Sequence, residues 1–450
     1  MGRRFRVQGP AKGLRGSVKV PGDKSIGHRA LMFASLAEGR STIQGLSAGL
    51  DNRSTAELFR ELGVTIELGD EHAIVDGVGL FGLSMPKGAL DCGNSGTTMR
   101  LVAGLLAGQR FGTRLIGDES LTKRPMRRIV EPLRARGAHI AGRSGDKEGE
   151  IYPPLAVAPL IEGEQLTALE YASPIASAQV KSSLLLSGLY AAGATAIREP
   201  VVSRDHTERM LGALGVPIQA VGPMVVLDPV GWDRRWSGFE WTVPGDISGA
   251  AFMFAAATMV PGSDVTVEGV GLNPTRTGIL DALRGMRADL RFMPKGDAAG
   301  GEPSGDVQVV HRPLAATMTA GEMLTRMIDE VPAFCAIAAT AKGRSDVRDA
   351  HELRVKESDR VATSAEVLEA FGVDCTELQD GLHVHGGARL EGARVASRGD
   401  HRIAMMAAVL GLVAHGETIV DDVECVATSF PGFADTLASL GADIVEEDSP

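Results

Sequence analysis

The sequence predicts an α/β protein made of two domains, each with three repeated units. At 450 residues, the chain exceeds what one hydrophobic core usually serves. The stretch VPGD occurs at 20–23 and again at 243–246, and similar text follows both copies. A unit of about 75 residues that opens with an apolar helix recurs along the chain, with starts near Ser25, Asn94, Ser177, Ile247, Val331 and Asp400.

Each unit is expected to contain two helices of different character. The first is apolar almost all round, as in IAMMAAVLGLVA at 403–414, and such a helix is buried on every side. The second carries apolar residues at i, i+3, i+4 and i+7, which predicts one buried face, and it leads into a β-rich segment. These second helices are expected within 55–66, 126–140, 206–218, 275–290, 364–375 and 433–444.

The two VPGD stretches are predicted to mark where the chain crosses between domains, because Pro-Gly fixes a turn. Domain 1 then comprises 1–21 with 244–450, and domain 2 comprises 22–243, with a hinge at 20–24 and 243–247. The first 20 or so residues therefore belong with the C-terminal half. The polar, glycine-rich loops 143–150 and 295–306 are expected to be exposed hairpin tips.

Composition argues against several classes of protein. A net charge of -11, with only three Trp and three Tyr, disfavours a nucleic-acid partner. The four isolated cysteines indicate a reducing compartment, without a disulfide framework or a zinc site. The N-terminal segment lacks the apolar core of a signal peptide, and no apolar run is long enough to span a membrane. We expect a cytoplasmic protein without membrane partners.

Three short motifs do not carry a function here. GVGLFG at 77–82 lacks the following helix of a dinucleotide fingerprint. GLSAG at 45–49 matches a nucleophile elbow, but Gly-Ser turns are common in a chain with 56 glycines. HVH at 383–385 has no third ligand nearby, so an exposed strand explains it better than a metal site does.

Basic residues gather near the starts of the apolar helices, where helix N-termini already favour anions. Capping and solvated faces are the alternative explanation for each of them taken alone. Because the pattern recurs in five units of an acidic protein, we expect a site for multiply charged anions. The fourth of the repeated units, which starts near Ile247, opens without a cation, although its NPTRTG motif carries Arg276. The cations are Lys24, Arg29, Lys123, Arg124, Arg127, Arg128, Lys181, Arg204, Lys356, Arg360 and Arg402.

Nine motifs, in order over nearly the whole chain, resemble the EPSP synthase family of 3-phosphoshikimate 1-carboxyvinyltransferases. They are PGDKSIGHR, GNSGTTMR, TKRPM, SAQVKS, RDHTE, NPTRTG, LRVKESDR, DHRIAM and ATSFPGF. The RPM, SAQ, RDHTE and NPTR spellings resemble the second class of the family, which is known for glyphosate-tolerant members. The resemblance implies a two-domain inverted α/β barrel of six βαβαββ repeats, three in each domain, with the active site between the domains.

The resemblance also implies a reaction. The enolpyruvyl group of phosphoenolpyruvate moves to the 5-hydroxyl of shikimate 3-phosphate through a tetrahedral intermediate, and phosphate is released. The two substrates bring roughly five to six negative charges, which explains the gathering of cations. Positioning and electrostatics do the catalysis, so neither a metal nor an organic cofactor is expected.

The residues at the motif positions are implied to take the family's roles. Asp329 resembles the base that accepts the 5-hydroxyl proton, Glu357 resembles the acid that protonates the methylene carbon, and Lys24 contacts both substrates. The set implied for shikimate 3-phosphate is Lys24, Ser25, Arg29, Ser177, Ala178, Gln179, Arg204, Asp329 and Lys356. The set implied for phosphoenolpyruvate is Lys24, Asn94, Gly96, Thr97, Arg124, Gln179, Arg360 and Arg402.

Two positions depart from the family pattern. Thr428 stands where many members have Lys, and Gly96 stands where tolerant second-class members have Ala. Glyphosate competes at the phosphoenolpyruvate site in this family, so tolerance does not follow from the class spelling. The chain is expected to be a monomer.

Two alternative functions are each disfavoured by particular residues. A UDP-N-acetylglucosamine enolpyruvyl transferase has the same fold and reaction type, but it carries a catalytic Cys on the loop that corresponds to SLTKRPM. Here no Cys lies between Cys92 and Cys335. A non-catalytic anion-binding protein would have no need of Asp329 and Glu357 beside the cations.

Overall fold

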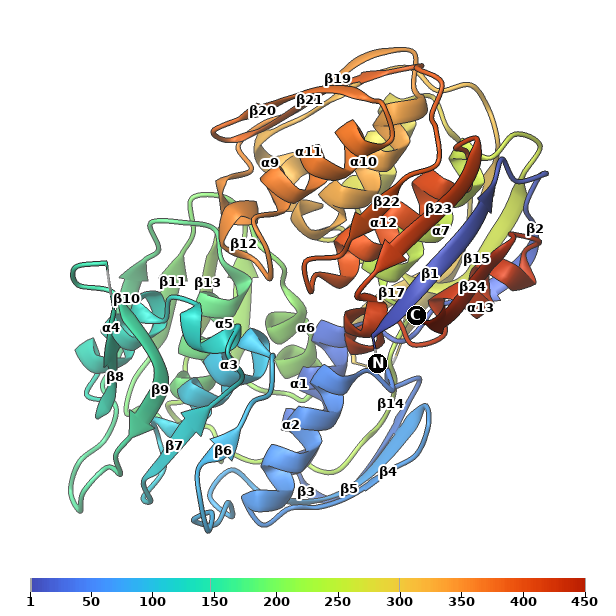
Figure 1. The fold of residues 1–450 in the computed structure, drawn as a ribbon. Coiled ribbons are helices and arrows are strands. Elements are labelled where there is room, and N and C mark those ends of the chain that lie inside the picture. Colours follow the sequence, from blue (N-terminus) through green and yellow to red (C-terminus); the bar gives the residue numbers. More distant parts are fainter. Residues whose placement is uncertain (1, 146, 299, 450) are drawn as a thin grey trace. The chain divides into compact units, whose positions relative to one another are not determined.

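The protein is represented by a computed structural model that describes residues 2–145, 147–298 and 300–449, and within them six sheets of four strands each (Figure 1). The chain divides into two compact units. Unit 1 comprises Met1–Asp23, Pro244–Gly296 and Pro303–Pro450, and unit 2 comprises Lys24–Val243 and Asp297–Glu302. Each unit contains three of the sheets.

All six repeats have the same topology, which β6 to β9 illustrate. β6 (Leu90–Asp91) and β7 (Thr113–Ile116) are parallel, and α3 (Gly96–Leu106) lies between them in the chain as the crossover that parallel strands require. α4 (Arg127–Ala135) follows, and then β8 (Ile140–Ser144) and β9 (Ile151–Val157) form an antiparallel hairpin whose last strand pairs with β7. The strand order is β6-β7-β9-β8, and every other sheet repeats it, so the predicted βαβαββ unit is confirmed.

Unit 2 contains two further repeats. In the sheet β14-β3-β5-β4, the first strand comes from the far end of the unit's sequence. That repeat comprises α1 (Lys24–Ser35), β3 (Glu38–Gln44), α2 (Leu50–Glu61), β4 (Thr65–Leu68), β5 (His72–Val78) and β14 (Glu240–Thr242). The other comprises β10 (Leu169–Ala172), α5 (Ala178–Gly188), β11 (Thr195–Arg198), α6 (His206–Ala213), β12 (Ile218–Val221) and β13 (Met224–Leu227).

Unit 1 contains three repeats, and the N-terminal strands complete two of their sheets. The first comprises β2 (Arg15–Lys19), α7 (Ile247–Met259), β15 (Asp264–Gly271), α8 (Gly278–Gly285), β16 (Asp289–Ala298) and β17 (Glu302–Val310). The second comprises β18 (Met318–Thr319), α9 (Gly321–Thr325), α10 (Val331–Thr340), β19 (Gly343–Val347), α11 (Arg360–Ala370), β20 (Asp374–Leu378) and β21 (Gly381–Gly386). The third comprises β22 (Arg394–Ala396), α12 (His401–Gly411), β23 (Gly416–Asp421), α13 (Phe433–Ser439), β24 (Ile444–Asp448) and β1 (Arg3–Gly9).

Four short 3-10 helices are described besides these elements. They are η1 (Leu121–Lys123), η2 (Ile328–Glu330), η3 (His351–Val355) and η4 (Val423–Thr428). None of the helices in the described ranges is long and apolar enough to cross a membrane.

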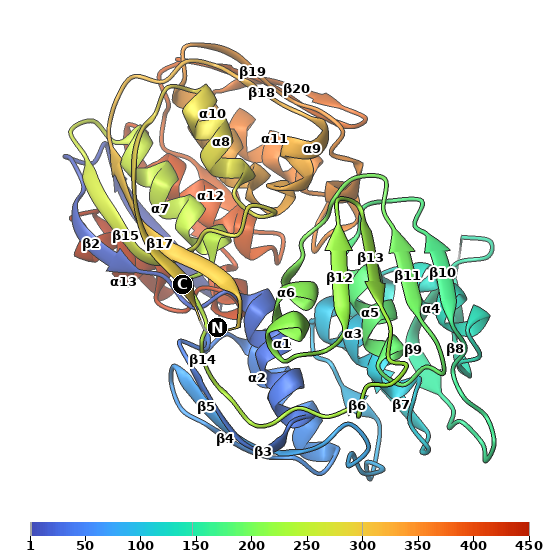
Figure 2. The same cartoon turned by 180° about the vertical axis from the view of Figure 1, so that it is seen from behind.

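The apolar helices form the core of each unit. Every residue of α7 is buried, and α7, α10 and α12 pack against one another inside unit 1 (Figure 2). In unit 2, α3 packs against α5 and α1. A helix with no polar face cannot lie at a surface without exposing apolar area, so the sheets lie outside these helices. The predicted burial on every side is confirmed.

The two VPGD stretches bind each other. Gly22 and Gly245 form an antiparallel bridge, Asp23 N–H donates to the Pro244 carbonyl at 2.7 Å, and Asp246 N–H donates to the Pro21 carbonyl at 2.8 Å. The chain passes from unit 1 to unit 2 after Asp23 and returns after Val243.

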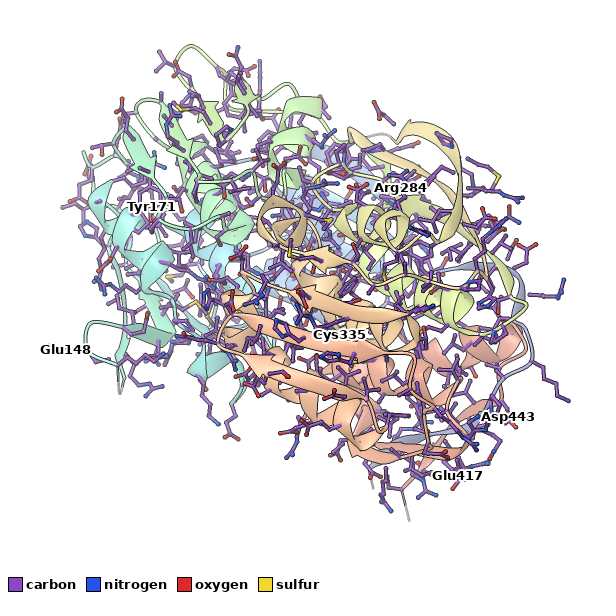
Figure 3. All side chains as sticks on the ribbon, turned by 90° about the horizontal axis from the view of Figure 1, so that it is seen from above. Glu148, Tyr171, Arg284, Cys335, Glu417 and Asp443 are labelled. Atoms are coloured by element: carbon purple, nitrogen blue, oxygen red, sulfur yellow. The ribbon has the colours of Figure 1, made fainter. Side chains whose placement is uncertain are left out.

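The loop at 295–306, predicted to be an exposed tip, is exposed at 295–297, whereas Gly300 and Glu302 are buried. Asp297–Glu302 belongs to unit 2, and the remaining parts of β16 and β17 belong to unit 1. By these bounds the chain passes between the units at four places. The other predicted tip is exposed at 147–149, and Figure 3 shows Glu148 projecting from it.

Candidate active site

The first of two residue sets lies in unit 2, at and near the N-termini of its helices. It comprises Lys24, Ser25, Arg29, Asn94, Gly96, Thr97, Arg100, Arg124, Ser177, Ala178, Gln179 and Arg204. Lys24 is the first residue of α1, and its Nζ lies 2.9 Å from Oδ2 of Asp51. Ser177 caps α5, because its side chain accepts a hydrogen bond from the Val180 N–H at 3.4 Å, and Ala178 opens that helix. Capping residues of this kind are selected because the first N–H groups of a helix lack partners within the helix.

Gln179 connects the starts of α3 and α5. Its Nε2 donates to Thr97 Oγ1 at 3.0 Å, and its Oε1 accepts from Arg100 Nη1. Arg100 is 4% exposed and also donates to the Pro125 carbonyl. Arg100 was not predicted as a site residue, although Arg100 ends the GNSGTTMR motif.

Arg124 lies beside the same helix start. Its Nη2 donates to Asn94 Oδ1 at 2.6 Å and to Ser120 Oγ at 3.2 Å, so both of these acceptors are neutral. A Cβ added to Gly96 would lie 2.9 Å from Arg100 Nη1 and 3.3 Å from Arg124 Nη1. Glycine at this position therefore leaves the space between two guanidinium groups open.

Arg29 is buried and joins three helices of unit 2. Its Nε donates to Thr207 Oγ1 at 2.7 Å, its Nη2 donates to Ser182 Oγ at 2.7 Å, and its Nη1 donates to the Ser25 carbonyl at 2.8 Å. Arg204 lies half-buried in the loop that precedes α6.

Several predicted anion-binding cations have carboxylate partners of their own. Lys181 lies 2.8 Å from both Glu199 and Glu208. Burial acts to lower the pKa of Lys181, but the two carboxylates raise it above its ordinary value, so the ammonium is held in an internal ion pair. Lys123 pairs with Glu119, and Arg127 pairs with Glu131, at the surface. These three cations do not belong to the first set.

The second residue set lies in unit 1, around Asp329 in η2. Oδ1 of Asp329 lies 3.2 Å from Lys356 Nζ and 3.3 Å from Arg360 Nη1. Its main-chain carbonyl accepts from Arg402 Nη1 at 2.7 Å. Three cations from the motifs LRVKESDR and DHRIAM thus meet at Asp329, two at its carboxylate and one at its main-chain carbonyl.

Arg360 is the centre of this set and is almost completely buried. Glu357 Oε2 lies 2.7 Å from its Nη2, and Asp400 accepts from its Nε at 2.8 Å and from its Nη2 at 3.1 Å. Burial acts to lower the pKa of Arg360, but these carboxylates together with Asp329 raise it. For Asp400, burial acts to raise the pKa, but the Arg360 charge outweighs this and lowers it.

Asp400 was not predicted as a site residue. Its signal was the GDHRIAM motif, where it caps α12 by accepting the Arg402 N–H at 3.0 Å. The expectation for Arg360 also changes, since its guanidinium holds three carboxylates. Unit 1 thus contributes equal numbers of cations and carboxylates to the second set, which comprises Asp329, Lys356, Glu357, Arg360, Asp400 and Arg402.

No cation stands at 428. The Thr428 hydroxyl donates to the Cys425 carbonyl at 2.6 Å within η4. Among the described residues, no group of three or more His, Cys, Asp or Glu side chains could hold a metal ion.

Comparisons with known proteins identify the family of this chain. A sequence model of the family described as "EPSP synthase (3-phosphoshikimate 1-carboxyvinyltransferase)" matches residues 8–437. A 3-phosphoshikimate 1-carboxyvinyltransferase from Geobacter sp. (strain M21) is 50% identical over 433 residues, which cover 96% of this chain and 98% of the relative. One from Brevibacillus brevis is 47% identical over 436 residues, covering 97% and 99%.

Solved structures give the same answer. The EPSP synthase of Acinetobacter baumannii has a TM-score of 0.87 and 40% sequence identity, and the match covers 99% of this chain and 100% of that one. The enolpyruvyl transferase NikO from Streptomyces tendae has a TM-score of 0.76 at 18% identity, which shows a shared fold alone. The predicted two-domain enolpyruvate-transferase fold is confirmed.

Proposed function

The chain belongs to the EPSP synthase family and has its activity in the shikimate pathway, and from this premise we propose how the two residue sets divide the reaction. The substrates of the family are phosphoenolpyruvate and shikimate 3-phosphate. The observation that carries the proposal is that Asp329 and Glu357 lie on the same guanidinium, that of Arg360.

Shikimate 3-phosphate is assigned to the starts of α1 and α5 and to Lys356. Helix N-termini offer N–H groups and a positive dipole end to a phosphate or carboxylate. Around them stand cations and hydroxyls that are already anchored, as Arg29 is to Thr207 and Ser182. The residues of this assignment are Lys24, Ser25, Arg29, Ser177, Ala178, Gln179, Arg204, Asp329 and Lys356.

Phosphoenolpyruvate is assigned to the start of α3 and to Arg402. Arg124 and Arg100 flank Gly96, and Gln179 and Thr97 offer polar atoms beside them. Arg360 supports this assignment chiefly by holding the reacting carboxylates. The residues are Lys24, Asn94, Gly96, Thr97, Arg124, Gln179, Arg360 and Arg402.

Asp329 is assigned as the base. Lys356 and Arg360 beside one of its oxygens stabilise the carboxylate, which is the form that accepts a proton. In the addition step, the 5-hydroxyl oxygen bonds to C2 of phosphoenolpyruvate and its proton passes to Asp329. The reaction needs no metal for this step, since the developing charges meet preorganised cations.

Glu357 is assigned as the acid. Of the three carboxylates on Arg360 it is the most exposed, with 22% of its side chain accessible against 11% for Asp329 and none for Asp400. It can therefore exchange protons with solvent. Glu357 gives a proton to the methylene carbon, which becomes a methyl group in the tetrahedral intermediate. In the elimination step, the C2–O bond to phosphate breaks, the methyl group returns a proton to Glu357 and the double bond forms again. The proton held by Asp329 leaves with the phosphate.

Further assignments rest on the sequence. The RPM, SAQ, RDHTE and NPTR spellings favour the second class of the family. The cysteine pattern favours a cytoplasmic enzyme, and we expect it to act as a monomer with a hinge at 20–24 and 243–247. Glyphosate is expected to compete with phosphoenolpyruvate.

The substrate assignment is tested by measuring how substitutions change the KM for each of the two substrates. Lys356→Met and Arg204→Met should raise the KM for shikimate 3-phosphate about 10- to 100-fold, since each removes a charge-assisted hydrogen bond. Arg124→Met should act in the same way on phosphoenolpyruvate. Lys123→Met, which removes the adjacent surface ion pair with Glu119, is the matched control and should change neither KM. If Arg124→Met altered only the KM for shikimate 3-phosphate, the assignment would be wrong.

A further inference from the structure

Arg276, in the turn between β15 and α8, is a buried cation to which neither the sequence motifs nor the proposed mechanism gives a role. It is 3% exposed. Its guanidinium lies 3.6 Å from Asp23, 3.3 Å from Asp246 and 3.6 Å from Glu330. These carboxylates come from three distant places in the sequence, and Arg276 brings them to one point.

Two of the three carboxylates belong to the repeated VPGD stretches. Asp23 ends the first copy and Asp246 ends the second, and their backbones already bind each other across the Gly22–Gly245 bridge. Asp23 is followed directly by Lys24, the residue assigned to both substrates. Arg276 therefore holds Asp23, and Asp23 in turn sets the position of the main chain of Lys24, which follows it.

The third carboxylate leads to the reacting group. Arg276 Nη2 donates to Ser248 Oγ at 2.9 Å, and Ser248 Oγ donates to Glu330 Oε1. The same oxygen of Glu330 lies 3.8 Å from Arg402 Nη1, which donates to the Asp329 carbonyl. Glu330 is completely buried and follows Asp329 in the chain.

Burial of a charged group costs free energy unless an opposite charge is paired with it. Burial acts to lower the pKa of Arg276, but the carboxylates of Asp23, Glu330, Asp246 and Asp329 raise it, so the guanidinium stays charged. Removal of one member of a buried ion network leaves the others uncompensated. The positions of Glu330 and Asp23 thus depend on Arg276.

We propose that Arg276 is a positioning residue for enolpyruvyl transfer. Through Glu330 it fixes Arg402 and the backbone of Asp329, and through Asp23 it fixes the start of Lys24. The inference deepens the proposed function and depends on the roles given there to Lys24, Asp329 and Arg402. It also gives the repeated VPGD a purpose, since each copy supplies one carboxylate to the same cation.

The test compares Arg276→Gln and Arg276→Lys with a matched control. Arg136 in unit 2 is also fully buried, and it donates to the Thr167 carbonyl, Ser187 Oγ and Thr195 Oγ1. Arg136→Gln removes a buried guanidinium of equal size whose hydrogen bonds go to Thr167, Leu184, Ser187 and Thr195, none of which belongs to either residue set. Steady-state kinetics with both substrates and thermal unfolding are measured for each variant.

We expect Arg276→Gln to lower kcat about 100-fold and to raise the KM for phosphoenolpyruvate, at a temperature where the protein is folded. Arg276→Lys should recover at least 10-fold of the lost kcat, because it keeps the charge. Arg136→Gln should lower the unfolding temperature but leave kcat and both KM values within about twofold. Glu330→Gln should lower kcat as well, and the double variant Arg276→Gln/Glu330→Gln should be no worse than the poorer single variant.

Other results would overturn the inference. If Arg276→Gln behaved like Arg136→Gln, with altered stability and normal kinetics, Arg276 would be purely structural. Multiplicative losses in the double variant would mean that Arg276 does not act through Glu330. If Arg276→Gln does not fold, Ser248→Ala takes its place. That variant removes the hydroxyl between the two groups and keeps both charges, so a normal kcat would equally contradict the inference.

The failure of the proposed function would look different. Asp329→Asn with unchanged turnover would remove the proposed base, whatever the Arg276 variants do. Low turnover in Asp329→Asn, with normal kinetics in Arg276→Gln, would contradict only the inference on Arg276.

Discussion

Asp400 holds Arg360 with both carboxylate oxygens, Oδ2 at 2.8 Å from Nε and Oδ1 at 3.1 Å from Nη2. Arg360 in turn contacts Asp329 and Glu357, so this pair sets the position of both proposed catalytic carboxylates. The Asp400 side chain is completely buried, and only 1% of the Arg360 side chain is exposed. Its removal should therefore affect both stability and turnover.

Asp400→Asn should destabilise unit 1 by about 3–5 kcal/mol at neutral pH, because a buried guanidinium loses its main partner. The folded pKa of Asp400 lies below its ordinary value of 3.8, so the pair stabilises the protein above pH 3.8. That contribution is lost as the pH falls through the lower folded pKa. Urea unfolding of both proteins over a pH series should show the difference shrinking below pH 3.8, and a constant difference would contradict the assignment.

Asp329→Asn and Glu357→Gln should each lower kcat about 10²–10⁴-fold, since each removes one proton transfer. Shikimate 3-phosphate should still bind, because the helix N-termini and the cations of unit 2 are untouched. Phosphate release and equilibrium binding measure the two effects separately. Turnover like that of the unmodified enzyme in either variant would take that residue out of the mechanism.

Gly96→Ala should weaken glyphosate more than phosphoenolpyruvate. The added Cβ would press on Arg100 Nη1 at 2.9 Å and approach Arg124 Nη1 at 3.3 Å, and the longer inhibitor tolerates this shift less well. The KM for phosphoenolpyruvate and the inhibition constant for glyphosate give the comparison. If the unmodified enzyme already resists millimolar glyphosate, Gly96 does not decide sensitivity, and attention moves to Thr428.

Glu302→Gln should loosen the segment 300–302 from unit 2. Glu302 Oε1 lies 2.7 Å from Nδ1 of the buried His206, and Gly300 lies close to the indole ring of Trp241. Loss of the hydrogen bond between Glu302 and His206 should expose Trp241 to water and shift its fluorescence to longer wavelength. The control is Glu148→Gln in the exposed hairpin of the same unit, which should leave the spectrum unchanged (Figure 3). An unshifted spectrum in Glu302→Gln would mean that packing alone holds the segment.

The repeats could be predicted from sequence because their cause is local. The apolar helices bury every face, and that pattern is visible in each helix on its own. Near the start of the chain, β1 pairs with β23 and β24, which lie near its end.

Motifs do not show which side chains from separate segments contact one another in the fold. Lys181 was predicted to bind an anion because the sequence does not show that its side chain meets Glu199 and Glu208, which neutralise it. The burial of Glu302 depends in the same way on His206. Arg276 was noticed as a cation, but its role required knowing that Asp23, Asp246 and Glu330 meet around it.

The exchange of hydrogen at the methylene carbon tests the division of roles between Asp329 and Glu357 most directly. In D₂O with shikimate 3-phosphate, the unmodified enzyme should place deuterium in the methylene group of phosphoenolpyruvate, since protonation gives a methyl group and its reversal releases one hydrogen. Mass spectrometry of the recovered phosphoenolpyruvate measures this. Glu357→Gln should slow the exchange at least about 100-fold, because the variant has no carboxyl proton to give. Exchange in Glu357→Gln at the rate of the unmodified enzyme would contradict the account.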